Sequence, residues 1–218
     1  MVKAVLFDMD GVIVNTEPLH RQAYFNMFDE VNIDVAPDFY DRFTGQATMA
    51  ICENLCKHFE LKQKPLDLLN IKRKHFKYLF DSGDLTLIDG VLDAIKDYHS
   101  NGITLVLASS ASMLNIERIF NRFDLDRYFK AKISGADLKA SKPHPEIFIR
   151  ASELAKAEKE NCIVIEDSTN GMKAAKAAGI FCVGFRGPTS SNQDFSIADK
   201  VISDFKELPF QALEKLLS

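Results

Sequence analysis

The chain has 218 residues and a mass of 24.5 kDa, enough for one large domain or two small ones. Hydrophobic residues make up 46% and charged residues 27%, close to the average of globular proteins, which excludes collagen-like, coiled-coil and disordered classes. The 27 Lys and Arg against 31 Asp and Glu give a net charge of −4. This net negative charge argues against a nucleic-acid surface.

The sequence predicts a cytoplasmic protein with no membrane partner. No apolar run approaches the roughly 20 residues that span a bilayer, and the first one, Val2–Phe7, meets Asp8 too early for a signal peptide. The 4 cysteines are too few for a disulfide framework. Cys52 and Cys56 lie one helical turn apart with His58 nearby, but a zinc site needs about four ligands, and no second cluster completes it.

The predicted elements begin with a strand at Val2–Phe7. The stretch that follows contains helical patterns at Leu19–Phe28, Thr48–Phe59 and Leu66–Phe80 and no convincing strand. We therefore expect an inserted α-helical cap domain at residues 15–83. The core is then discontinuous and consists of residues 1–14 and 84–218.

In the rest of the chain, short runs of Val, Ile, Leu and Phe alternate with amphipathic stretches. This is the pattern of strands that crossover helices bury on both faces. The predicted strands are Ile103–Ala108, Ala131–Ser134, Cys162–Ile165, Ile180–Phe185 and Lys200–Ile202, and the predicted helices are Gly90–Ser100, Glu146–Ala157 and Asn170–Ala178. The fold class is α/β, with a Rossmann-like doubly wound parallel sheet in the core.

Polar side chains follow three of these strands, at the sheet edge where reactive groups gather in such folds. They are Asp8 and Asp10, Ser109 and Ser110, and Glu166 and Asp167, while the loop before Pro145 supplies Lys142. Four carboxylates on one edge would raise one another's pKa unless they shared a cation, and oxygen ligands suit Mg²⁺. We therefore predict a Mg²⁺ site formed by Asp8, Asp10, Glu166 and Asp167.

Mg²⁺ completes its shell with waters and phosphate oxygens, so the implied ligand is a phosphoryl group. The hydroxyls of Ser109 and Ser110 and the ammonium of Lys142 are suited to bind its other oxygens. One carboxylate of the Asp8 and Asp10 pair would attack phosphorus, and the other would protonate the leaving oxygen. An Asp-x-Asp-Gly stretch is also typical of an ordinary turn, but its coincidence with the other strand-end residues disfavours that interpretation.

Four motifs carry a resemblance to a known family. They are Leu6-Phe7-Asp8-Met9-Asp10-Gly11-Val12-Ile13, Leu107-Ala108-Ser109-Ser110, Ser141-Lys142-Pro143 and Val164-Ile165-Glu166-Asp167-Ser168. With them the chain resembles the haloacid dehalogenase-like superfamily, and most of all its β-phosphoglucomutase-like phosphatases.

The resemblance implies a role for each of these residues. It makes Asp8 the nucleophile and Asp10 the general acid/base, whose backbone carbonyl would also bind Mg²⁺. Ser109 and Lys142 would clamp the phosphate, and Glu166 with Asp167 would anchor the metal. The second aspartate of the first motif speaks against the dehalogenase branch, which needs no metal.

The resemblance extends to the cap. The segment from Phe43 to Thr48 is similar to the family's substrate loop, which implies substrate contacts for Gly45, Gln46 and Thr48. His20 would lie near the hinge and hydrogen-bond the Asp10 region, although alone it is typical of an ordinary helix histidine. Lys74 matches a cap lysine that approaches the phosphate, although it lies in a run typical of a solvated face.

We therefore expect a Mg²⁺-dependent phosphatase that hydrolyses a small phosphorylated metabolite, a sugar phosphate, through an aspartyl-phosphate. One alternative is a phosphomutase, which is disfavoured because Thr48 stands where β-phosphoglucomutase has its phosphate-binding arginine. An alternative of another class is a phospho-aspartate signalling module, which is about half this length and has no inserted domain. A monomer is the simplest assembly for a cap that opens and closes.

Overall fold

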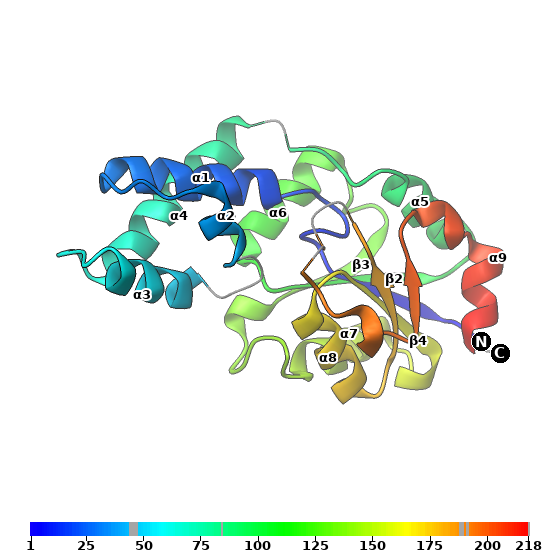
Figure 1. The fold of residues 1–218 in the computed structure, drawn as a ribbon. Helices are drawn as coiled ribbons and strands as arrows, with labels where there is room; N and C mark the ends of the chain where they lie inside the picture. Colours follow the sequence, from blue (N-terminus) through cyan, green and yellow to red (C-terminus); the bar gives the residue numbers. More distant parts are fainter. Residues whose placement is uncertain (44–47, 84, 188–189, 191, 218) are drawn as a thin grey trace. The chain divides into compact units, whose positions relative to one another are not determined.

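The computed structural model describes residues 1–43, 48–83, 85–187, 190 and 192–217. They divide into two compact units (Figure 1). The sheet unit comprises Met1–Asn15 and Leu87–Ser218, and the inserted unit comprises Thr16–Thr86. The sequence analysis expects a core domain at residues 1–14 and 84–218 and a cap domain at residues 15–83. That the two units act as a core and a cap stays a prediction.

The sheet unit is built on six parallel strands in the order β3-β2-β1-β4-β5-β6. The strands are β1 (Ala4–Phe7), β2 (Thr104–Ser109), β3 (Phe129–Ser134), β4 (Cys162–Glu166), β5 (Phe181–Phe185) and β6 (Lys200–Ile202). All six coincide with predicted strands to within about two residues at each end. This confirms the doubly wound α/β architecture and puts β1 between β2 and β4, at the centre of the sheet.

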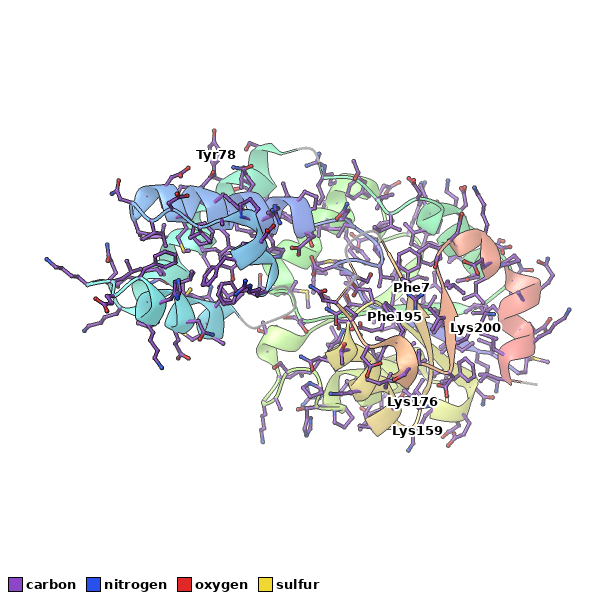
Figure 2. All side chains as sticks on the ribbon, viewed as in Figure 1. Phe7, Tyr78, Lys159, Lys176, Phe195 and Lys200 are labelled. Atoms are coloured by element: carbon purple, nitrogen blue, oxygen red, sulfur yellow. The ribbon has the colours of Figure 1, made fainter. Side chains whose placement is uncertain are left out.

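Helices cover both faces of the sheet. They are α5 (Val91–Ser100), α6 (Met113–Phe123), α7 (Glu146–Ala155), α8 (Thr169–Ala178) and the short α9 (Phe210–Leu213). Leu6 of β1 packs in one apolar cluster with Phe148 of α7 and Met172 of α8. Phe7, the next residue, has its ring centroid 6.3 Å from that of Tyr98 of α5, on the other face. Figure 2 shows the position of Phe7 in the sheet unit. Alternate side chains of a strand point to opposite faces, so β1 is buried on both.

The inserted unit consists of helices around an apolar core. They are α1 (Glu17–Glu30), α2 (Pro37–Asp41), α3 (Thr48–His58) and α4 (Pro65–Ser82). Three match the predicted patterns, whereas the five-residue α2 is too short to show a periodicity. Met27, Phe28, Leu55 and Leu68 are fully buried in the core of this unit. In the described part of the chain, no helix is long and apolar enough to cross a membrane.

Candidate active site

The carboxyl ends of β1, β2 and β4 bring three predicted site residues together. Asp8 directly follows β1, and its backbone N–H donates to the carbonyl of Ile165 on β4 at 3.0 Å. The ammonium of Lys142 lies 2.5 Å from Asp8 Oδ1 and 2.8 Å from Glu166 Oε1. It also donates to the carbonyl of Ala108 at 3.0 Å. Lys142 therefore joins the ends of three neighbouring strands and places a positive charge between two carboxylates.

Burial governs the electrostatics of this group. It raises the pKa of the Asp8 carboxyl to about 7, helped by the nearby Glu166 and Asp10 charges and opposed by Lys142. Burial alone would lower the pKa of Lys142, but the carboxylates of Asp8 and Glu166 outweigh it and raise that pKa above its usual value. Lys142 thus stays charged and supports the ionised form of Asp8.

Glu166 is held by a residue that the sequence analysis missed. The backbone N–H and the hydroxyl of Ser168 both donate to Glu166 Oε2, at 2.7 and 2.9 Å. The same hydroxyl accepts from the N–H of Gly171 at 3.0 Å, which caps α8. A serine directly before a helix is a recognisable N-cap signal, and this could have identified Ser168. A Cβ on Gly171 would lie 1.6 Å from Glu166 Oε1, so only glycine fits beside this carboxylate.

Gly11 directly follows Asp10 and lies against the side chain of Asp167. Gly11 has a φ of +83°, and its N–H donates to the carbonyl of Val14 at 2.8 Å, which closes a tight turn after Asp10. A Cβ at Gly11 would lie 2.1 Å from Asp167 Oδ2, so the Asp167 carboxylate rests directly against the turn. Burial raises the pKa of Asp167 well above its usual value, and the neighbouring Glu166 and Asp8 charges add to the effect.

The two serines after β2 differ in exposure. Ser109 is fully buried, and its hydroxyl oxygen accepts from the N–H of Ala111 at 3.0 Å. Ser110 is exposed. At the end of β3 the Ser134 hydroxyl donates to the carbonyl of Ala111 at 2.8 Å. The segment after β2 is therefore fixed beside the acidic edge, and the hydroxyl hydrogen of Ser109 is available for a further acceptor.

The donor chemistry of the acidic edge fits Mg²⁺. All four side chains offer carboxylate oxygens, which hard cations prefer. The charges of Glu166 and Asp10 add to the raised pKa values of Asp8 and Asp167, and Lys142 opposes both shifts. Among the described residues, no group of three His, Cys, Asp or Glu side chains is already arranged around a metal position. The edge thus carries more negative charge than one lysine offsets.

Comparison with known proteins decides the family. Residues 5–185 match the family model described as haloacid dehalogenase-like hydrolase. The chain belongs to this family. The match covers the strand ends that carry Asp8, Ser109 and Glu166 and the loop that carries Lys142, so the chain is a hydrolase of the haloacid dehalogenase-like type.

Named relatives cover most of this haloacid dehalogenase-like hydrolase. It is 32% identical to the phosphorylated carbohydrates phosphatase of Thermotoga maritima, over 82% of each chain. It is 26% identical to hexitol phosphatase B of Escherichia coli, over 95% of this chain and 94% of the relative. The crystal structure of CbbY from Rhodobacter sphaeroides in complex with xylulose-(1,5)bisphosphate matches with a TM-score of 0.78 and 28% identity, covering 95% of this chain and 96% of that one.

The inserted unit of the hydrolase holds His20 and Lys74 in different surroundings. His20 Nδ1 lies 2.7 Å from the ammonium of Lys72, a residue that the sequence analysis did not select. Lys74 is exposed and pairs with Glu30 at 3.4 Å. Within this unit the histidine is thus joined to Lys72 and not to Lys74, because Lys72 is on the buried side of α4.

The other predicted cap residues lie in or beside the substrate-loop segment. Thr48 is the first residue of α3. Gly45 and Gln46 lie outside the described residues. The contacts expected of all three with substrate stay predictions.

Proposed function

We propose that the protein is a Mg²⁺-dependent phosphatase of small phosphorylated metabolites of the sugar-phosphate class and that it works through an aspartyl-phosphate. The observation that carries the proposal is the group formed by Lys142 with Asp8 and Glu166 at the ends of three strands. Two relatives named for phosphatase activity on phosphorylated carbohydrates and hexitols support the substrate class.

The first chemical step uses the ionised Asp8. One of its carboxylate oxygens attacks phosphorus and forms the aspartyl-phosphate, while the bond from phosphorus to the leaving oxygen breaks. Asp10 donates its proton to that oxygen, so the product leaves as an alcohol. Lys142 balances the negative charge that Asp8 and the phosphoryl group share.

The second step releases phosphate. A water molecule attacks phosphorus and Asp10 takes its proton, which restores the acid form of Asp10. The bond between phosphorus and the Asp8 oxygen breaks, so inorganic phosphate leaves and the Asp8 carboxylate is regenerated. In both steps Ser109 donates its hydroxyl hydrogen to a phosphoryl oxygen, because the hydroxyl oxygen already accepts from Ala111.

Asp8, Asp10, Glu166 and Asp167 would hold the Mg²⁺ ion, and Lys142 and Ser109 would complete the phosphate site. When bound, the ion offsets the charge of the carboxylates and polarises the phosphoryl group. Glu166 also has a positioning role, since it accepts hydrogen bonds from Lys142 and from Ser168. We place the protein in the cytoplasm, as a monomer.

Phosphate release from a panel of sugar phosphates, nucleotides, pyrophosphate and phosphonates tests the proposal. The panel is run with Mg²⁺ and with a chelator, on the wild-type chain and on Asp8→Asn. We expect metal-dependent release from a few sugar phosphates and a loss of about 10³-fold or more in Asp8→Asn. Near-normal turnover of Asp8→Asn would exclude the mechanism. Isomerisation of a hexose phosphate without phosphate release, stimulated by a sugar bisphosphate, would show a mutase instead.

A further inference from the structure

Ser168 makes more hydrogen bonds than the capping of α8 requires. Its hydroxyl oxygen accepts from the N–H of Gly171 at 3.0 Å, and this is the bond that caps the helix. Since a backbone N–H can only donate, the single hydrogen of the hydroxyl is left for Glu166 Oε2, which lies at 2.9 Å. The backbone N–H of Ser168 donates to the same carboxylate oxygen at 2.7 Å. The side chain therefore has two roles, and only the first concerns the helix.

Capping alone does not explain a hydroxyl at this position. An N-cap side chain needs only an oxygen that accepts, and Asp and Asn provide one as well as Ser does. Two other caps of the chain are the carboxylates of Asp194 and Asp204, each of which accepts from the backbone N–H two residues further on. A carboxylate at position 168 would cap α8 too, but it would place a second negative charge against Glu166. The hydrogen of the Ser168 hydroxyl is therefore the feature that serves Glu166.

Glu166 is fixed at both of its carboxylate oxygens. Oε2 accepts the two bonds from Ser168, and Oε1 accepts from the ammonium of Lys142 at 2.8 Å. Because a Cβ on Gly171 would lie 1.6 Å from Oε1, the carboxylate is packed against the first turn of α8, where the helix dipole favours a negative charge. With both oxygens bound, Glu166 is held in one orientation and presents Oε1 to Lys142.

The position of the Lys142 ammonium is set by its acceptors. An ammonium has three N–H donors, and the acceptors here are Asp8 Oδ1, Glu166 Oε1 and the carbonyl of Ala108. The Ala108 carbonyl belongs to β2 and cannot turn. If Glu166 rotated away, one donor of the lysine would lose its acceptor, and the ammonium would be free to shift relative to Asp8. A continuous series of hydrogen bonds therefore leads from Ser168 to the Asp8 carboxylate.

We propose that Ser168 is a positioning residue for the reaction, because its hydroxyl holds Glu166 in the orientation that aims the ammonium of Lys142 at Asp8. The inference rests on the proposed function, in which Lys142 balances the negative charge that Asp8 and the phosphoryl group share. Ser168 acts through Glu166 and takes no part in making or breaking bonds. A cation that is displaced from the reacting groups stabilises the transition state less, so loss of the hydroxyl slows turnover.

Two variants of Ser168 separate the hydrogen-bond donor from the helix cap. Ser168→Thr keeps a hydroxyl that can both cap α8 and donate to Glu166. Ser168→Gly keeps nearly all of the capping preference, because glycine is a good N-cap residue, but it has no side-chain hydrogen to donate. We expect kcat/KM for glucose 6-phosphate and p-nitrophenyl phosphate with Mg²⁺ to fall about tenfold in Ser168→Gly and to stay within about threefold of wild type in Ser168→Thr. If capping were the only role, both variants would turn over like the wild type.

Ser152→Ala is the control for removing a serine hydroxyl from the sheet unit. Ser152 lies on α7, is buried, and donates its hydroxyl hydrogen to the carbonyl of Ile149 at 2.7 Å. Neither of these residues belongs to the acidic edge, so kcat/KM should be that of the wild type. Wild-type kcat/KM in Ser168→Gly, with a circular dichroism spectrum that shows a folded chain, would overturn the inference.

A double-mutant cycle tests the same inference without turnover. The bonds described above join Ser168 to Lys142 through Glu166, so Ser168→Gly and Lys142→Met are coupled only if Glu166 transmits the position of one to the other. Urea unfolding of the wild type, the two single variants and the double variant measures the coupling. We expect Lys142→Met to change the equilibrium constant of unfolding at least about threefold less in the Ser168→Gly background, where Glu166 is already poorly aimed. The pair of Ser152→Ala and Lys142→Met should be additive.

The two experiments distinguish failure of the inference from failure of the proposed function. Additivity of Ser168→Gly and Lys142→Met would overturn the inference whatever the turnover of the variants. A wild-type chain that releases no phosphate from these two esters or from the panel above would contradict the proposed function alone, because the unfolding cycle contains no substrate. Coupling in that cycle would still support the positioning of Lys142 by Ser168 through Glu166.

Discussion

Each unit of the protein buries a lysine, and the contacts that the structure describes for the two lysines differ in kind. Lys142 in the sheet unit lies between the carboxylates of Asp8 and Glu166, with 6% of its side chain exposed. Lys72 in the inserted unit is 4% exposed and faces a neutral imidazole and two aromatic rings. The positive charge of Lys142 stabilises the two carboxylates. The ammonium of Lys72 donates to His20 Nδ1 and so leaves the ring proton of the neutral imidazole on Nε2.

Replacing each lysine by methionine should separate these roles and gives the largest expected effects. Lys142→Met leaves two buried carboxylates without their cation, and we expect it to lower the free energy of unfolding by about 3–5 kcal/mol. Lys72→Met leaves the Nδ1 atom of His20 without its donor, which costs about 1–3 kcal/mol. Urea unfolding of both variants measures the difference.

Lys77→Met is the control for this pair. Lys77 is on α4, and its ion pair with Asp81 is exposed, with 65% of the lysine side chain accessible. Such pairs contribute at most about 1 kcal/mol, so this variant should unfold almost like wild type. A loss for Lys72→Met as large as that for Lys142→Met would contradict the distinction between the two lysines.

The acidic edge also depends on backbone that only glycine can provide, which Gly11→Ala tests. Gly11 and Gly102 have nearly equal φ values of +83° and +79°. A Cβ at Gly11 would collide with Asp167, whereas one at Gly102 would meet no atom within 4 Å. Both alanine variants should lose about 1–2 kcal/mol of stability from the left-handed backbone. Only Gly11→Ala should also lose turnover, by about 10²-fold, because it displaces a carboxylate of the site.

Phosphate release and thermal unfolding of the two glycine variants are the measurements. Equal turnover in Gly11→Ala and Gly102→Ala would show that the position of Asp167 does not limit the reaction.

The sequence predicted the sheet and the acidic edge more fully than it predicted the inserted unit. Strands that are buried on both faces appear in the sequence as apolar runs. The residues that follow parallel strands meet at one edge of the sheet. Asp8, Ser109 and Glu166 could therefore be selected from their positions at the ends of these runs. Ser168 was missed because its role depends on capping α8 and holding Glu166 together. A motif search for reactive groups does not reveal such a positioning residue.

In the inserted unit, helical periodicity located α1, α3 and α4 but not which lysine faces inward. Lys72 and Lys74 are two residues apart on α4, so they point to different sides of the helix. The family resemblance favoured Lys74, whereas burial beside Tyr24 and Phe76 distinguishes Lys72.

A pH dependence of stability is also expected, and it belongs to the inserted unit. His20 has a pKa of about 3 in the folded protein, against 6.5 for an ordinary histidine. Between these values the unfolded chain binds a proton that the folded chain does not, so the free energy of unfolding falls as pH decreases from 6.5 towards 3. One such group contributes a slope of at most about 1.4 kcal/mol per pH unit.

Removing the imidazole should therefore flatten this part of the stability curve. Chemical unfolding of wild type and His20→Gln between pH 7 and pH 4.5 measures it, and the difference between the two curves isolates His20 from the carboxylates that titrate in both. We expect the wild-type curve to fall more steeply below pH 6.5. Parallel curves would mean that His20 takes up a proton in the folded protein. An imidazolium has no acceptor nitrogen, so the hydrogen bond from the Lys72 ammonium to His20 Nδ1 would then be excluded.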